Sequence, residues 1–310
     1  MNMQQKIVTV MMAFGWAAGT ALASSLPDTT PAPTQMVITV RPANGHAAPQ
    51  NLEARDLTVL HGNTRASVVR VERLAGDCAD MQLFILLDDS TRSSSLGIQL
   101  PELKQFVASL PATTQVAIGY MHNGTFGLAQ AFTTDHQKAA SALRLPESIP
   151  GGNGSPYFAL SDLVKHWPSK ESTNRRAVLM LTDGVDRYYS EAIMDDPYVD
   201  ATIHDALKEN VMVYSIYLRG AGLYGRRGFA TDIAQSRLMK VSQATGGQAY
   251  FQGFTDPVTV SPFLSDFQDR LDNQYLVTID DLSGKGVQPV KVRTELPGLK
   301  IEAPTQIYVR

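Results

Sequence analysis

Hydrophobic residues follow two different patterns along the chain. Between Met36 and Leu74, short apolar runs ("MVITV", "LTVL" and "ASVVRVERL") alternate with segments rich in turn-forming residues. Such runs predict strands, and no segment of useful length here has the helical period. We therefore expect residues 36–75 to form a small β unit, which needs a further layer to bury its apolar face.

After this unit, apolar strands alternate with helical segments. Three wholly apolar runs, "LFILL", "AVLML" and "VMVYSIYL", predict strands that are buried on both faces of a sheet. Helical spacing of apolar residues is found near residues 98–110, 157–167, 200–210, 232–245 and 262–275. This alternation predicts an α/β domain over residues 80–279, with a doubly wound, mostly parallel, Rossmann-like sheet covered by helices on both faces.

The C-terminal segment returns to a strand pattern. Residues 280–310 contain "VKVRTEL" and "QIYVR", which alternate as strands do. We expect these strands to pack on the 36–75 unit as a small β-sandwich-like unit. The α/β domain would then be inserted between two halves of the β unit.

The N-terminus has the pattern of an export signal. Lys6 precedes an apolar stretch from Ile7 to about Ala18, and Ala21-Leu22-Ala23 has the small-x-small pattern of a cleavage site. The stretch is shorter than the ~20 residues that a membrane span requires. These features predict a signal peptide at 1–23, a flexible Pro- and Thr-rich lead at 24–35, and a secreted or periplasmic protein without membrane insertion.

Composition narrows the function classes. The chain has 310 residues, of which 44% are hydrophobic and 18% charged, as in ordinary globular proteins. Its net charge of −3 provides no attraction for nucleic acid. Cys78 is the only cysteine, so no internal disulfide can form. The six histidines lack zinc-site spacing and there is no hydrolase nucleophile elbow, which favours a protein that is not an enzyme.

Polar side chains gather where the predicted strands end. "LLDDSTRS" places Asp88, Asp89 and Ser90 directly after a buried strand, "LMLTDGVD" places Asp183 after another, and "GGNGSPY" places Ser155 before a helix. Because the carboxyl ends of parallel strands lie on one edge of a sheet, we expect these groups to meet there. Carboxylates and hydroxyls suit Mg²⁺. Each group alone is more often a helix cap than a metal ligand, so the expectation depends on the three segments occurring together.

These segments resemble von Willebrand factor type A (VWA) domains, in particular the exported bacterial VWFA-related group. The family motif D-x-S-x-S corresponds to Asp88, Ser90 and position 92, the family's loop threonine to Ser155, and its TDG aspartate to Asp183. The segments "ATGG" and "NLEARDLTVL" extend the resemblance to about residues 51–279. The resemblance implies protein–protein or adhesive binding through a MIDAS-like metal site. The ion at that site would be Mg²⁺, Mn²⁺ or Ca²⁺, and an acidic side chain of a partner protein would complete its coordination.

One position departs from the family pattern. Residue 92 is Arg where the family has Ser, and a guanidinium cannot ligate a cation. Arg92 could instead pair with Asp88 and Asp183, which would give a metal-independent VWA-like scaffold. The metal-dependent and metal-independent interpretations both remain open at this stage.

Further residues are expected near the same edge of the sheet. The glycine-rich loop "LRGAGLYGRRGFATD" follows a buried strand and carries three basic residues. The candidate ligand-contact residues are Asp89, Arg92, Arg219, Arg226 and Arg227. A remote alternative is a haloacid-dehalogenase-like phosphatase, because "FILLDDST" resembles the opening hhhhDxDx[TV], although the second Asp of that motif is Ser90 here.

Overall fold

The computed structural model describes residues 33–42, 52–149, 152, 154–189, 195–219, 227–280 and 282–310. The signal peptide predicted at 1–23, most of the predicted lead, and Arg226 lie outside these residues. Pro31–Arg310 forms one compact unit. In the described ranges, no helix combines the length and the apolar character that crossing a membrane would require.

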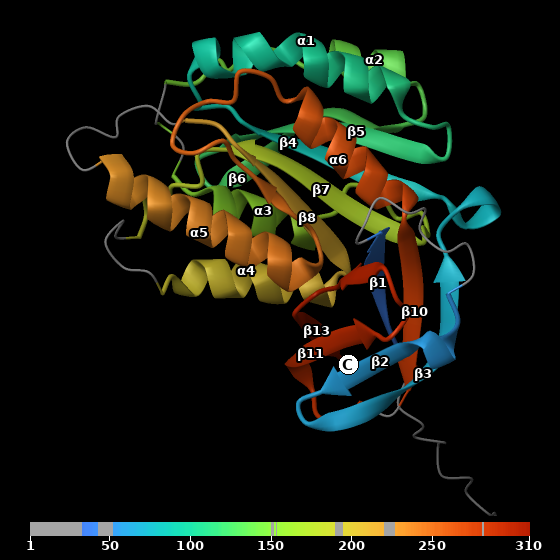
Figure 1. Ribbon diagram of the computed structural model, residues 1–310. Coiled ribbons are helices and arrows are strands. Elements are labelled where there is room, and N and C mark those ends of the chain that lie inside the picture. Colours follow the sequence, from blue (N-terminus) through green and yellow to red (C-terminus); the bar gives the residue numbers. More distant parts are fainter. Residues whose placement is uncertain are drawn as a thin grey trace, which may run out of the picture. The chain divides into compact units, whose positions relative to one another are not determined.

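A six-stranded sheet carries the helices (Figure 1). Its order is β6-β5-β4-β7-β8-β9. The strands are β4 (Met81–Asp88), β5 (Thr114–His122), β6 (Thr125–Thr133), β7 (Arg175–Thr182), β8 (Val211–Tyr217) and β9 (Ala249–Tyr250). All neighbours are parallel except β5 and β6, so the sheet is mostly parallel with one antiparallel edge strand. This is the doubly wound α/β arrangement that the apolar runs predicted.

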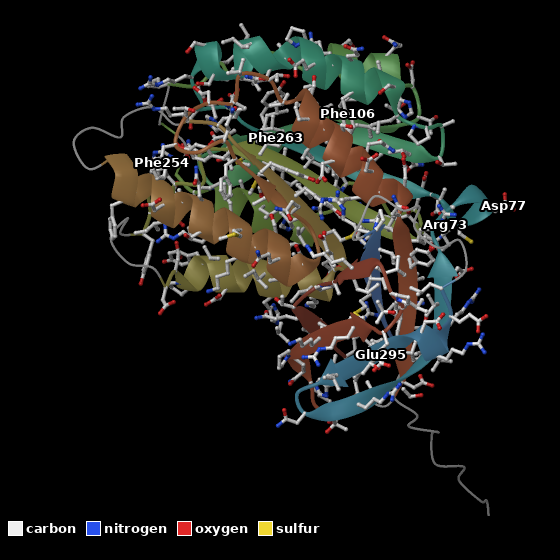
Figure 2. The ribbon with its side chains drawn as sticks, in the orientation of Figure 1. Arg73, Asp77, Phe106, Phe254, Phe263 and Glu295 are labelled. Carbon is white, nitrogen blue, oxygen red and sulfur yellow. The ribbon has the colours of Figure 1, made fainter. Side chains whose placement is uncertain are left out.

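The helices cover both faces of this sheet (Figure 1). They are α1 (Ser93–Ser109), α2 (His136–Ser141), α3 (Pro156–Lys165), α4 (Pro197–Lys208), α5 (Arg227–Thr245) and α6 (Ser261–Asp272). Alternate residues of β4 point to opposite faces, so Ile85 packs in one core with α1, α2 and α6, and Phe84 in the other with α3, α4 and α5. Phe106 of α1 is labelled in Figure 2. Its ring contacts that of Phe267 of α6, with centroids 5.8 Å apart.

Helix α1 begins earlier than its apolar spacing suggested. The backbone carbonyl of Arg92 accepts from the N–H groups of Ser95 and Leu96, so the helix starts at Ser93. Pro101 therefore lies inside the helix and not in its first turn. Its ring nitrogen cannot donate to the carbonyl one turn earlier.

The remaining strands form a second, entirely antiparallel sheet of seven strands. Its order is β12-β1-β10-β3-β2-β11-β13. The strands are β1 (Thr34–Pro42), β2 (Leu57–His61), β3 (Thr64–Arg73), β10 (Gln274–Asp280), β11 (Gly286–Thr294), β12 (Leu299–Glu302) and β13 (Gln306–Val309). N- and C-terminal strands therefore share one sheet.

Two features of this second sheet differ from expectation. Strand β10, which was assigned to the α/β domain, lies between β1 and β3. The strands do not form a sandwich of two separate layers. They form a single sheet that curls around its own core, as the contacts of β11 with β12 and of β1 with β13 show. The short link between β12 and β13 brings the two ends of the sheet together.

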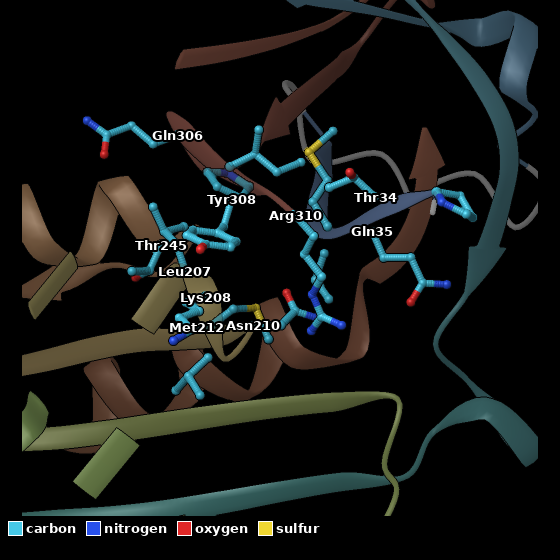
Figure 3. A pocket seen from close by; sticks show the side chains of 16 residues that line it. Thr34, Gln35, Leu207, Lys208, Asn210, Met212, Thr245, Gln306, Tyr308 and Arg310 are labelled. Atoms are coloured by element: carbon cyan, nitrogen blue, oxygen red, sulfur yellow. The ribbon is translucent and has the colours of Figure 1, made fainter. Parts of the chain in front are cut away.

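Buried polar contacts join the two sheets. The guanidinium of Arg175, on β7, donates to the backbone carbonyl of Leu271 (2.6 Å) and to Oε1 of Gln274 (2.7 Å). Arg270 of α6 forms ion pairs with Asp266 and with Glu302 of β12. A cavity of about 180 Å³ is lined by residues of both sheets, from β1 and β13 on one side and β8 on the other, and by residues of α4 (Figure 3).

Candidate functional site

The candidate site lies where β4 and β7 end. Asp88 is the last residue of β4, and Asp183 directly follows Thr182, the last residue of β7. These neighbouring strands mark the point where the strand order reverses, which is where open α/β sheets bind ligands. Asp88 is 1% exposed and Asp183 is 2% exposed. The structure thus brings together the two carboxylates that were predicted to meet.

Hydroxyl groups surround the Asp88 carboxylate. Its Oδ1 accepts hydrogen bonds from the backbone N–H (2.9 Å) and the hydroxyl (2.8 Å) of Ser90, and its Oδ2 accepts one from the Thr182 hydroxyl (2.9 Å). Burial, and then the Asp183 carboxylate, raise the pKa of Asp88 to about 6, although these hydrogen bonds lower it. Two adjacent negative charges are therefore unfavourable at this position, and a cation would relieve them.

A basic side chain from the same loop pairs with Asp183. Its Oδ1 accepts from the N–H of Val185 (3.0 Å), and its Oδ2 forms an ion pair with Nη2 of Arg187 (2.7 Å). Gly184 adopts a left-handed conformation (φ +68°) that turns the chain directly after Asp183. The sequence suggested that Arg92 would pair with Asp183. In the structure Arg187, which follows Asp183 by four residues, makes this ion pair.

Arg92 itself occupies a different role. It is the N-cap residue of α1, with a half-buried side chain that makes no capping hydrogen bond. Among the described residues, no ion pair joins Arg92 to Asp88 or Asp183. The proposal that Arg92 replaces the metal therefore lacks the contact on which it depended.

Ser155 belongs to a network beside the two carboxylates. It is the N-cap of α3, where its hydroxyl accepts from the N–H of Phe158 (3.3 Å) and donates to Oδ2 of Asp186 (2.8 Å). Asp186 also accepts from the N–H groups of Tyr188 and Tyr189. Burial raises the pKa of Asp186 despite these bonds. Capping and the bond to Asp186 account for Ser155 without a metal.

Asp89 anchors a neighbouring segment. Its Oδ1 accepts from the Arg144 guanidinium (2.6 Å) and the N–H of Glu147 (3.1 Å), while its Oδ2 accepts from the Ser148 hydroxyl (2.8 Å). Burial raises the pKa of Asp89, but these hydrogen bonds outweigh it and hold the pKa below its ordinary value. The loop between α2 and α3 is thereby attached to the end of β4.

The basic loop after β8 is described only in part. The backbone N–H of Arg219 donates to Oδ1 of Asp256 (2.7 Å), and Oδ2 of Asp256 accepts from the Ser95 hydroxyl of α1 (2.8 Å). Arg226 and the side chain of Arg227 lie outside the described residues. A ligand contact by these three arginines therefore stays a prediction.

The donor set at the site fits a hard divalent cation. No group of three or more His, Cys, Asp or Glu side chains in the described ranges is arranged to hold a metal. A cation would therefore rest on Asp88 and Asp183, with the hydroxyls of Ser90 and Thr182 and with retained water, which are ligands that Mg²⁺ accepts. The ion pair of Arg187 with Asp183 is the feature that opposes it.

Apolar side chains are exposed around this edge of the sheet. Ile149 (81% exposed) follows the segment anchored by Asp89, and Tyr188 (55%) follows the Asp186 turn. Phe254 (53%; labelled in Figure 2) and Val258 (80%) lie two residues before and after Asp256 in the loop after β9. A partner protein that bound at this edge would meet these side chains.

Two of the groups at this site were not among the predicted site residues. Thr182 ends an apolar strand, and its hydroxyl gives no sequence signal beyond its position beside Asp183. Arg187 could have been found from "DGVDR", because an acid and a base four residues apart can pair within a turn. Both lie within hydrogen-bond distance of a predicted ligand.

No protein-family model and no curated protein matches the sequence. Solved structures do match parts of it. BatB from Bacteroides thetaiotaomicron is 14% identical (61% of this chain, 96% of that chain, TM-score 0.42). The zinc-occupied MIDAS protein, proximal thread matrix protein 1 of the mussel byssus, is 14% identical (71% and 49%, TM-score 0.46). The pilus adhesin SpaC from Lactobacillus rhamnosus GG is 10% identical (82% and 47%, TM-score 0.46).

The class of the fold follows from the chain's own features: the order of the six-stranded sheet, its antiparallel edge strand, and the positions of Asp88 and Asp183. Together they define a VWA-like α/β domain.

Proposed function

We propose that this protein is a non-enzymatic binding module that recognises a partner protein at the carboxyl edge of its six-stranded sheet, with a divalent cation held by Asp88, Ser90 and Asp183. The observation that carries this proposal is the pair of buried carboxylates from adjacent strands, placed with hydroxyl donors at the reversal point of the sheet. Mg²⁺ is the first candidate, because this donor set contains oxygen alone. The predicted export signal would place the module outside the cytoplasm.

The surroundings of the site support recognition of a protein. Ile149, Tyr188, Phe254 and Val258 would supply apolar contact area around the ion. An acidic side chain of the partner would complete the coordination of the ion. The affinity for the partner would then depend on the metal, and the exposed apolar side chains would provide most of the contact area.

A second candidate function is binding without a metal. The ion pair of Arg187 with Asp183 favours it, because a guanidinium already neutralises one of the two carboxylates. In this case the partner would contact the same edge, and chelators would leave binding unchanged.

Calorimetric titration of the purified protein with Mg²⁺ and with Mn²⁺ tests the proposal. We expect saturable binding at or below millimolar concentration, which Asp183→Ala abolishes. The control is Asp200→Ala, which removes a carboxylate that is 60% exposed and paired with Lys240 on the surface. Absence of binding in both the wild type and the control would reject the metal and favour the second candidate.

A further inference from the structure

Arg187 is positioned to act on the metal site. Its guanidinium lies 2.7 Å from Oδ2 of Asp183, whose side chain is 3% exposed. The backbone N–H of Arg187 donates to the carbonyl of Gly154 (2.7 Å), and Nη1 donates to the carbonyl of Val185 (3.3 Å). The backbone of Arg187 is thus hydrogen-bonded to the loop before α3, and its side chain reaches Asp183.

A guanidinium and a divalent cation compete for the same carboxylate. Both would occupy the coordination space of Asp183, and two positive charges in contact within a buried site repel each other strongly. Asp183 can satisfy only one of them at full strength. Arg187 therefore determines how readily a metal ion binds at Asp183.

We propose that Arg187 is a tethered cation that excludes the divalent metal from Asp183, so that metal binding requires the Arg187 side chain to leave. This inference rests on the proposed function, because it concerns the same site. Arg187 then sets the metal affinity, and the site has an arginine-filled state and a metal-filled state. The residue acts by occupying the ion's position.

The exposure of the two partners agrees with such an exchange. The side chain of Arg187 is 21% exposed, compared with 3% for Asp183, so the guanidinium can reach solvent while the carboxylate stays in place. Next to it, the ring of Tyr188 is exposed and packs on Phe158, with centroids 5.6 Å apart. A released Arg187 would emerge at this edge, where it could form a charge-assisted hydrogen bond with the acidic group of a partner.

The test is Mn²⁺ titration of three variants beside the wild type. Arg187→Gln removes the tethered charge, Arg187→Lys keeps it, and Arg92→Gln removes a charge from the same edge without breaking an ion pair among the described residues. We expect Arg187→Gln to bind Mn²⁺ about tenfold more tightly or better than wild type. Arg187→Lys and Arg92→Gln should stay within about threefold of wild type. Circular dichroism and urea unfolding confirm that each variant is folded.

Each result has one meaning for the inference. If wild type binds Mn²⁺ and Arg187→Gln binds no better than Arg92→Gln, the inference is wrong and the metal site stands. If only Arg187→Gln binds, the inference holds and the wild-type site is filled by arginine, which is the second candidate function. If no variant binds, both the tethered-cation inference and the proposed metal site are rejected.

Discussion

Replacing Asp88 with Asn should stabilise the protein while it removes the metal site. The folded-state pKa of Asp88 is about 6, compared with an ordinary value of 3.8, chiefly because the side chain is buried and then because Asp183 is near. This difference corresponds to a free-energy cost of about 3 kcal/mol for keeping the carboxylate ionised in the folded protein. Asn carries no charge and avoids that cost.

The sign of the pH dependence follows from the direction of the shift. Between about pH 4 and pH 6 the unfolded chain carries an ionised Asp88, whereas the folded protein retains the proton. Wild-type stability therefore falls as the pH rises through this window and stays lower above it. In the wild type, Oδ2 of Asp88 accepts a hydrogen bond from the Thr182 hydroxyl. In Asp88→Asn the amide nitrogen at that position can only donate, so the hydrogen bond must reverse its direction, at a cost of about 1 kcal/mol.

Urea unfolding in the presence of a chelator, at pH 4 and at pH 7.5, measures this effect. We expect Asp88→Asn to be more stable than wild type by about 2 kcal/mol at pH 7.5 and to have no advantage at pH 4. Asp183→Asn should show the opposite sign at pH 7.5, because it breaks the ion pair with Arg187. An Asp88→Asn variant that is less stable than wild type at pH 7.5 would refute the reasoning that burial and repulsion dominate at this carboxylate.

Two further predictions concern residues around the site and the core. Gly247→Ala should lower the free energy of unfolding in urea by more than about 3 kcal/mol, because the added Cβ would lie 2.0 Å from the backbone oxygen of Val213. The control is Gly127→Ala, whose added Cβ would have its nearest neighbour at 3.9 Å, and its stability should be close to that of the wild type. The pKa of Asp89 is held below 3.8 by bonds that include the Arg144 guanidinium. Its stabilisation should be present above about pH 4 and lost as the pH falls through the lower folded-state pKa, so an acid titration of Asp89→Asn should show a smaller loss of stability than wild type.

The buried strands were predictable because their composition is unambiguous. A wholly apolar run such as "LFILL" has few alternatives to a strand covered on both faces, and β4 is buried throughout. Once β4 and β7 are known to be parallel neighbours, the meeting of Asp88 and Asp183 follows from geometry. The sequence therefore determined the two carboxylates of the site.

The partners of these carboxylates depended on details that composition does not specify. Arg187 reaches Asp183 because Gly184 turns the chain with φ +68°, whereas Arg92 begins a helix. Strand β10 was assigned to the wrong sheet because an apolar strand after a helix has the same pattern whichever sheet accepts it. Only the pairing of β10 with β1 and β3 distinguishes the two.

The sheet shared by N- and C-terminal strands has a consequence for the order of folding. Thr39 of β1 pairs with Gln274 on one side and with Glu302 on the other, so β1 has no strand partner until nearly the whole chain is available. The α/β sheet, in contrast, uses only strands between Met81 and Tyr250. Non-local pairing is slow, so we expect the α/β core to form first and the curled sheet to close last. During that interval the newly made β1 is an exposed apolar strand, and the time that closure takes sets how long the chain is vulnerable to aggregation.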